Sequence, residues 1–160
     1  MAAQAVADAA PTDPDVVLKP LRQLASEYES LRSQEDYSSS RTRKMAGIAK
    51  RMQAHAIAAA PYIATLMGST STGEHLAATV LLQMKYMPEH MEWLALRLVE
   101  ERAFIGYQAA SALFARVRVA GVAECRALQA AVLAAKIKRK ENGSVEDSLD
   151  RLIDRILESK

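Results

Sequence analysis

The residues best suited to acid–base or metal chemistry are three histidines, two of which have a carboxylate beside them. Glu74 precedes His75, Glu89 precedes His90, and His55 is the third histidine. A metal site on helices needs ligands that share one face, as in Glu-x-x-His or two histidines four residues apart. Neither spacing occurs in the chain, and neighbouring residues on a helix point about 100° apart. We therefore predict no metal site at these residues.

Nucleophilic and phosphate-binding patterns are equally sparse. The serines at 69 and 71 precede an expected helix, but the Gly-x-x-x-x-Gly-Lys pattern of a phosphate-binding loop is missing. Ser71 and Glu74 have the spacing of a capping box, which favours a structural role. Cys125 lies in an apolar segment without a histidine nearby in sequence, so we expect it to be packed rather than reactive. These patterns predict a non-enzymatic protein without catalytic residues or a cofactor.

Two basic clusters could contact the phosphates of a nucleic acid. The first consists of Arg41, Arg43, Lys44, Lys50 and Arg51, and the second of Lys136, Lys138, Arg139 and Lys140. The second ends a helix, where the dipole favours positive charge, whereas the first begins one. The formal net charge of +2 is too small to indicate nucleic-acid binding by itself. The other interpretation is a solvated surface that pairs with Glu35, Asp36 or the acidic last helix.

The composition fits one helical domain. The chain has 160 residues, half of them apolar and a quarter charged, which is enough to bury a core. One cysteine excludes an intrachain disulfide and a multi-cysteine zinc site. No apolar run approaches the roughly 18 residues of a membrane span, and the first residues lack the basic stretch of a signal peptide. We expect a cytoplasmic protein without membrane contact.

Apolar residues recur at spacings of three and four along most of the chain, and no segment alternates with period two. The pattern predicts an all-α fold of seven to eight helices. We expect a flexible Ala-rich tail over residues 1–13, a helical domain over 14–143 and a C-terminal amphipathic helix within 144–160. The expected helices cover 14–33, 41–60, 62–67, 72–86, a segment opened by Pro88, 104–118, 121–140 and 144–158.

The residues at the expected helix ends give further predictions. Asp13 before Pro14 is typical of a helix start, and Pro20 implies either a kink or a later start near Lys19. Ser40 and Ser144 are the expected starts of two other helices, and Asn142 with Gly143 forms a helix stop. We also expect Met84 to be buried, and four charged residues to face solvent. Those four are Arg97, Glu100, Glu101 and Arg102.

The last helix carries the best-formed apolar stripe. Its aliphatic residues are Val145, Leu149, Leu152, Ile153, Ile156 and Leu157. A stripe of this size must be covered, and covering it is worth several kcal/mol at roughly 25 cal/mol per Å2. Either the helix docks onto its own domain, or it binds a partner in the helix-in-groove mode. In the second case the partner-binding residues are Leu149, Leu152, Ile153, Ile156 and Leu157.

Two all-α architectures fit the middle of the chain. Short connections between residues 71 and 118 favour antiparallel neighbours, and alanines at regular points permit close helix approach. Stacked helical pairs, as in an α-solenoid, and a compact helical bundle both satisfy this pattern.

Three segments together resemble HEAT- or armadillo-like helical modules. They are STSTGEHLAA at 69–78, MEWLA at 91–95 and FIGYQAASAL at 104–113, and the preceding RTRKM at 41–45 fits the same pattern. The chain is in this respect similar to modules attached to TIR, peptidase or NTPase effector domains of bacterial conflict systems. The resemblance covers about residues 40–118, and it implies a sensing, scaffolding or oligomerising role.

These observations together predict a non-enzymatic helical protein–protein interaction module. We expect it to act as an adaptor, scaffold or oligomerisation protein, in a bacterial defence system according to the resemblance. A concave helical face and the C-terminal helix are the expected contact surfaces for a protein partner or a second copy. The alternative is a nucleic-acid-binding protein that uses the two basic clusters.

Overall fold

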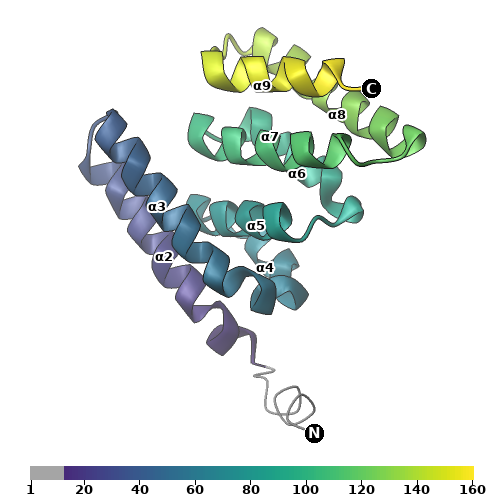
Figure 1. Ribbon diagram of the computed structural model, residues 1–160. Helices are drawn as coiled ribbons and strands as arrows, with labels where there is room; N and C mark the ends of the chain where they lie inside the picture. The colour runs from purple at the N-terminus through teal and green to yellow at the C-terminus, as the bar shows by residue number, and fades with distance from the viewer. Residues whose placement is uncertain (1–12) are drawn as a thin grey trace, which may run out of the picture.

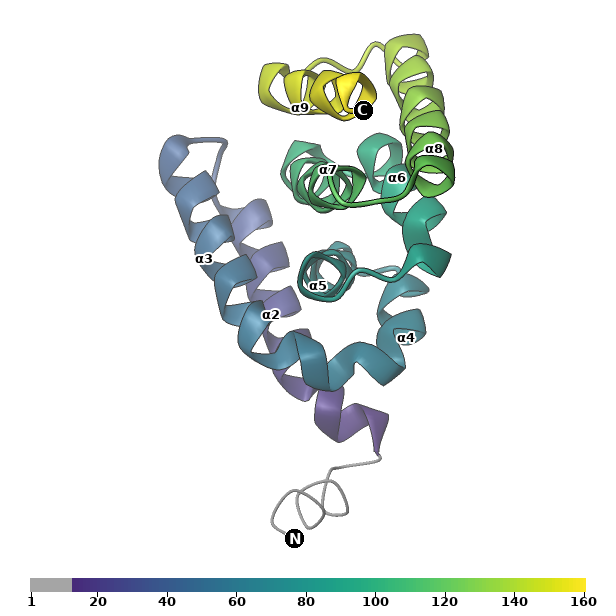
Figure 2. The ribbon, with the colours of Figure 1, turned by 45° about the vertical axis from the view of Figure 1, so that its right-hand side comes forward.

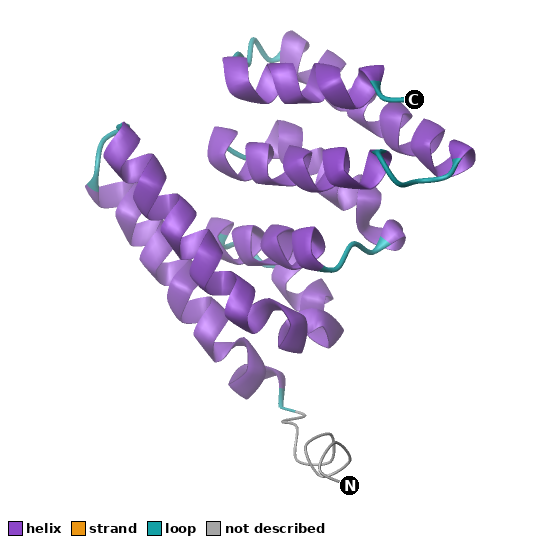
Figure 3. Ribbon diagram, in the orientation of Figure 1, coloured by secondary structure: helices purple, strands orange, loops and turns teal. Residues whose placement is uncertain are grey.

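A computed structural model describes residues 13–160, and every regular element in this range is a helix (Figures 1 and 3). The α-helices are α2 (Pro14–Gln34), α3 (Ser39–Ala56), α4 (Ile63–Met67), α5 (Thr72–Met84), α6 (Met91–Glu100), α7 (Ala103–Val117), α8 (Val122–Glu141) and α9 (Asp147–Glu158). Two 3-10 helices, η1 (Ile57–Tyr62) and η2 (Pro88–His90), precede α4 and α6. The all-α prediction is confirmed, and α4 has only five residues. Residues 1–12 of the predicted tail lie outside the described range.

The start of α2 follows the prediction from Asp13 and Pro14. The Asp13 carboxylate accepts a hydrogen bond from the Asp15 amide at 2.9 Å, and α2 continues through Pro20. The later start near Lys19 is therefore wrong.

Helix α3 begins earlier than expected. Ser38 has an extended backbone, and its hydroxyl accepts from the Arg41 amide at 3.0 Å. Ser40 already lies inside the helix and cannot be the cap. Three consecutive serines offer the same side chain, so the backbone conformation selects among them.

Helix α5 has half of the predicted capping box. The Ser71 hydroxyl accepts from the Glu74 amide at 3.1 Å, as expected. The Ser71 amide, however, donates to the Ser69 hydroxyl at 3.0 Å. The Glu74 carboxylate instead lies 3.7 Å from Arg22 in α2. The reciprocal bond is absent because Ser69 already satisfies the amide that Glu74 was expected to reach.

The turn between α8 and α9 confirms one prediction and corrects another. Gly143 has φ +71°, so it provides the left-handed stop that was expected after Asn142. The cap of α9 is Glu146 rather than Ser144, because the Glu146 carboxylate accepts from the Leu149 amide at 2.7 Å. Helix α9 is correspondingly shorter at its start than the predicted 144–158.

The helices form two stacked layers with a hairpin packed against one of them (Figures 1 and 2). Helices α5, α7 and α9 lie one above another, and α6 and α8 lie behind them. The α2–α3 hairpin crosses the α5 side of this stack, where both of its helices contact α5. The fold thus joins stacked helical pairs to a hairpin around one continuous core.

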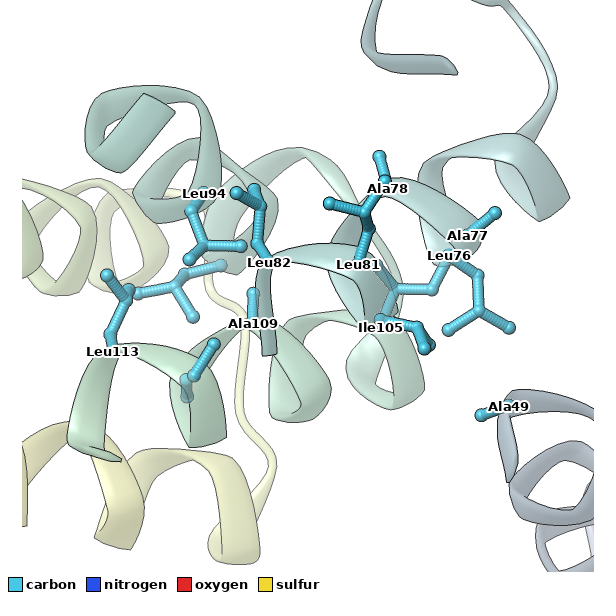
Figure 4. Close-up of a cluster of buried hydrophobic side chains, with 14 of the residues drawn as sticks. Ala49, Leu76, Ala77, Ala78, Leu81, Leu82, Leu94, Ile105, Ala109 and Leu113 are labelled. Atoms are coloured by element: carbon cyan, nitrogen blue, oxygen red, sulfur yellow. The ribbon is translucent and has the colours of Figure 1, made fainter. Parts of the chain in front are cut away.

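Helix α5 is the centre of the core. Its residues 76 to 82 are all buried, as expected for a helix covered on every side. Figure 4 shows Leu82 of α5 with Leu94 of α6 and Ala109 of α7 around it. The prediction that Met84 is buried is wrong, since its side chain is 45% exposed at the end of α5.

Helix α9 docks onto its own domain through the apolar stripe. Leu149 and Ile156 have no exposed surface, Leu152 and Ile153 are also buried, and Leu157 is partly buried. The partner-binding prediction for these five residues is corrected by this finding, because α7 and α8 cover the stripe. Val145, which was counted in the stripe, precedes the helix and is 79% exposed.

Candidate partner-binding cleft

A cleft opens where the α2–α3 hairpin diverges from the stack. The hairpin packs on α5, but its loop end stands away from α7 and α9 (Figure 2). A hollow of about 430 Å3 lies between them. Its walls are the α2–α3 connection and the start of α3 on one side, and the first turns of α7 and α9 on the other. We refer to this hollow as the hairpin cleft.

Aromatic side chains form much of the hairpin cleft. Tyr37 of the connection is 84% exposed, and Tyr107 of α7 is 40% exposed. Phe104 lines the cleft as well and is partly buried. Large rings with this exposure offer apolar area and a polar tip, a combination that is enriched where proteins bind one another.

Two guanidinium groups also line the hairpin cleft, Arg32 of α2 and Arg41 of α3. Arg32 donates to the Tyr28 hydroxyl at 3.2 Å and contacts the Met45 sulfur at 3.9 Å. Arg41 donates to the main-chain oxygen of Glu35 at 2.9 Å. Within residues 13–160, neither guanidinium lies within 4.0 Å of a carboxylate oxygen.

The hydrogen-bond acceptors of both guanidinium groups are neutral. Burial raises the pKa of Tyr28, although the hydrogen bond from Arg32 opposes the shift, so Tyr28 gives Arg32 a neutral acceptor. The Nε of Arg41 is buried and has no acceptor in the described part of the chain. The guanidinium N–H groups that are not buried bind an incoming anion more strongly than a neutral acceptor.

The other partly buried arginines are matched with carboxylates. Arg97 lies 2.8 Å from Glu101, Arg116 lies 2.6 Å from Glu124, and Arg139 lies 3.0 Å from Asp150. The hydrogen bond from Arg116 lowers the pKa of Glu124. Burial and the nearby Glu124 carboxylate raise the pKa of Tyr86, whose ring lies under Arg116, to about 12. The hairpin cleft therefore differs from these sites, because its two arginines have no carboxylate partner among residues 13–160.

A second hollow of about 330 Å3 adjoins the cleft at Arg32, which lines both. Glu101 lines its wall and belongs to a buried ionic network behind it. The Glu101 carboxylate lies 2.8 Å from Arg97 and 2.5 Å from Nδ1 of His75. The guanidinium of Arg97 stacks over the Trp93 ring at 4.3 Å. This network ties α5 to the junction of α6 and α7, and so fixes the base of the second hollow.

The ionic network corrects the expectation that Arg97 and Glu101 face solvent. Each of these side chains is only 5% exposed. Their spacing of four residues within one helix segment is visible in the sequence, as is the spacing of Trp93 and Arg97. Glu101 also contacts His75, which comes from another helix, and the spacing carries no information about that contact.

The structure separates the two basic clusters. Helix α3 lies in the hairpin and α8 in the rear layer, with α7 and α9 between them (Figure 2). In the first cluster Arg41 lines the cleft, Lys44 pairs with Glu35 at 2.9 Å and Arg51 with Glu27 at 2.8 Å. Arg43 and Lys50 are exposed.

The second cluster is largely engaged with the chain itself. Lys136 pairs with Asp154 at 2.7 Å, which raises the lysine pKa, and Lys138 lies 4.0 Å from Glu141. Lys140 is exposed. The prediction that Arg139 contacts nucleic acid is corrected, because this residue is 6% exposed and bonds to the main chain of α6.

Comparisons with known proteins give no information on the function of this chain. No protein-family model, curated protein or solved structure matches this chain. Among residues 13–160, no three His, Cys, Asp or Glu side chains gather as a metal site. In the same range no helix has both the length and the apolar character to cross a membrane.

Proposed function

We propose that this protein is a non-enzymatic helical interaction module that receives a segment of a partner protein in the hairpin cleft. The observation that carries this proposal is the pairing of exposed rings with unmatched guanidinium groups in one concave site. Tyr37 and Tyr107 supply the rings, and Arg32 and Arg41 supply the charge. Elsewhere the partly buried arginines are matched with carboxylates, so the cleft is the surface best suited to a partner.

The fold supports an adaptor or scaffold role. The stacked helices and the ionic network behind the cleft hold its walls in place, which limits the ordering that a partner must impose. The resemblance of residues 40–118 to modules of bacterial conflict systems supports a cytoplasmic role in defence. The apolar stripe of α9 is covered within the chain, so self-association would use a different surface.

Photo-crosslinking tests the proposed function in the cells that produce the protein. A photoreactive phenylalanine replaces Tyr37 in the cleft, and in a control it replaces Val119, which is 74% exposed beyond the other end of α7. We expect a discrete protein adduct from position 37 that is absent at position 119. Equal adducts at both positions, or none at position 37, would contradict the proposal.

Nucleic-acid binding receives less support from the geometry. The two basic clusters lie on different sides of the stack, and six of their nine members are engaged within the chain. A steep loss of DNA or RNA binding with salt would favour this alternative.

A further inference from the structure

We infer that the hairpin cleft recognises an acidic peptide segment that also carries a large apolar side chain. This inference rests on the proposed function and specifies the chemistry of the partner. It combines three observations about the cleft as the described residues form it: two guanidinium groups without a carboxylate partner, exposed aromatic rings, and a single carboxylate, that of Glu146, at the rim.

The positive charge favours a carboxylate ligand. Arg32 and Arg41 are bonded to a phenol and a main-chain oxygen, and within residues 13–160 neither makes an ion pair. A planar guanidinium presents several N–H groups in a fork that matches a carboxylate. A carboxylate in the cleft would accept hydrogen bonds from the Nη groups of Arg32 and Arg41, which the described chain itself bonds only to neutral acceptors.

The N-terminal end of α7 adds to the positive electrostatic potential of the cleft. Arg102 precedes this helix and makes no side-chain cap, and Ala103 and Phe104 of its first turn line the cleft. The positive end of the helix dipole therefore faces the space beside Arg32 and Arg41.

The aromatic rings require an apolar group on the same ligand. Tyr37 is stacked against Arg41 at 5.7 Å and is otherwise 84% exposed. Tyr107 stands across the cleft with 40% of its surface exposed. An aliphatic or aromatic side chain inserted between these rings would remove apolar area from water while an adjacent carboxylate reaches an arginine.

The rim of the cleft favours a peptide over a nucleic acid. Glu146 is the one carboxylate residue among the described residues that line the cleft, and its oxygens accept hydrogen bonds from the Ser148 and Leu149 amides. A continuous phosphate chain through the cleft would have to pass this carboxylate, which opposes it. A short peptide with one or two carboxylates can direct them to the arginines. The volume of about 430 Å3 is in the usual range for a site that holds a few side chains.

The test is an unbiased selection on the full chain. Random dodecapeptides displayed on phage are selected against the immobilised protein, and the affinities of enriched peptides are then measured. We expect enriched peptides to combine Asp or Glu with Leu, Phe or Trp. Arg32→Gln and Arg41→Gln should each weaken their binding about tenfold, the effect of one charged hydrogen bond. Arg126→Gln, an exposed arginine on α8, is the matched control and should leave affinity unchanged.

A second variant keeps the test independent of folding. Tyr37→Ser alters a side chain that is 84% exposed, so it leaves the fold intact and should still weaken binding about fivefold. Enriched peptides that are neutral or basic, but lose affinity in Tyr37→Ser, would overturn the acidic inference and leave the proposed function standing. If the enriched peptides bind every cleft variant with unchanged affinity, or if no peptide is enriched, both the acidic-peptide inference and the proposed function are overturned. Displacement of the peptides by a short oligo-dT would favour nucleic acid and overturn the inference.

Discussion

Arg139 of α8 donates a hydrogen bond from Nη1 to the main-chain oxygen of Leu98 in α6, at 3.0 Å. Leu98 lies in the last turn of α6, where carbonyl groups have no partner within the helix. The other end of the same guanidinium donates to Asp150 of α9 at 3.0 Å. One arginine thus caps α6 and joins it to the C-terminal helix.

Arg139→Ala is expected to lower the free energy of unfolding by about 2–4 kcal/mol. The substitution leaves the carbonyl of Leu98 without this hydrogen-bond donor and removes the ion-pair partner of Asp150. Urea denaturation of the full chain measures this value. Lys140→Ala, at the exposed neighbouring position, is the control and should change stability by less than about 0.5 kcal/mol. Equal effects of the two variants would show that Arg139 has no special role.

Gly73→Ala is expected to destabilise the fold by more than about 2 kcal/mol. A Cβ at this position would overlap the main-chain oxygen of Ala25 and lie 2.6 Å from its Cα, so α5 would have to move away from α2. Thermal unfolding followed by circular dichroism gives the change. Gly47→Ala is the matched control: a Cβ there meets nothing within 4 Å inside α3. It should stabilise by about 0.5–1 kcal/mol, and a Gly73→Ala variant of native stability would refute the close approach.

Ile156→Ala tests the docking of α9. Ile156 is fully buried, so its truncation should lower the free energy of unfolding by about 2–4 kcal/mol through lost burial and a cavity. Chemical denaturation provides the measurement. Val145→Ala, at the 79% exposed position before α9, should have an effect near zero. If Ile156→Ala were neutral, α9 would not be docked as the structure has it.

The ion pair of Arg116 and Glu124 predicts a pH-dependent contribution to stability. The hydrogen bond from Arg116 holds the pKa of Glu124 below its ordinary value of 4.5, so the folded state favours the charged carboxylate. This stabilisation is present above pH 4.5 and is lost as the pH falls through the lowered value. The stability difference between the native chain and Glu124→Gln should therefore shrink on acidification.

A double-mutant cycle isolates that effect from other titrations. Melting temperatures are measured for Arg116→Gln, Glu124→Gln and the double variant between neutral and strongly acidic pH. The coupling between the two positions should be positive at neutral pH and approach zero in acid. A coupling that stays constant over this range would contradict the proposed origin of the pKa shift.

Local sequence signals specify the helices and several of their ends. Asp13 before Pro14, Ser71, and Asn142 with Gly143 specify caps through bonds or backbone angles within a few residues. The apolar spacing of three and four residues likewise encodes the all-α class locally. Where neighbouring residues offered equivalent caps, as at Ser38 and Ser40, the sequence could not choose, because the extended backbone at one position decides it.

Which charges are buried and which surfaces remain open depends on contacts between helices. The buried Glu101 contacts His75 of α5, and the buried Arg139 donates to the main chain of Leu98 in α6. The apolar stripe of α9 indicates that this face of the helix is buried, but the sequence does not identify α7 and α8 as the helices that bury it. The hairpin cleft also depends on how far α3 stands from α7 and α9. Such contacts join residues distant in sequence, so local periodicity cannot encode them.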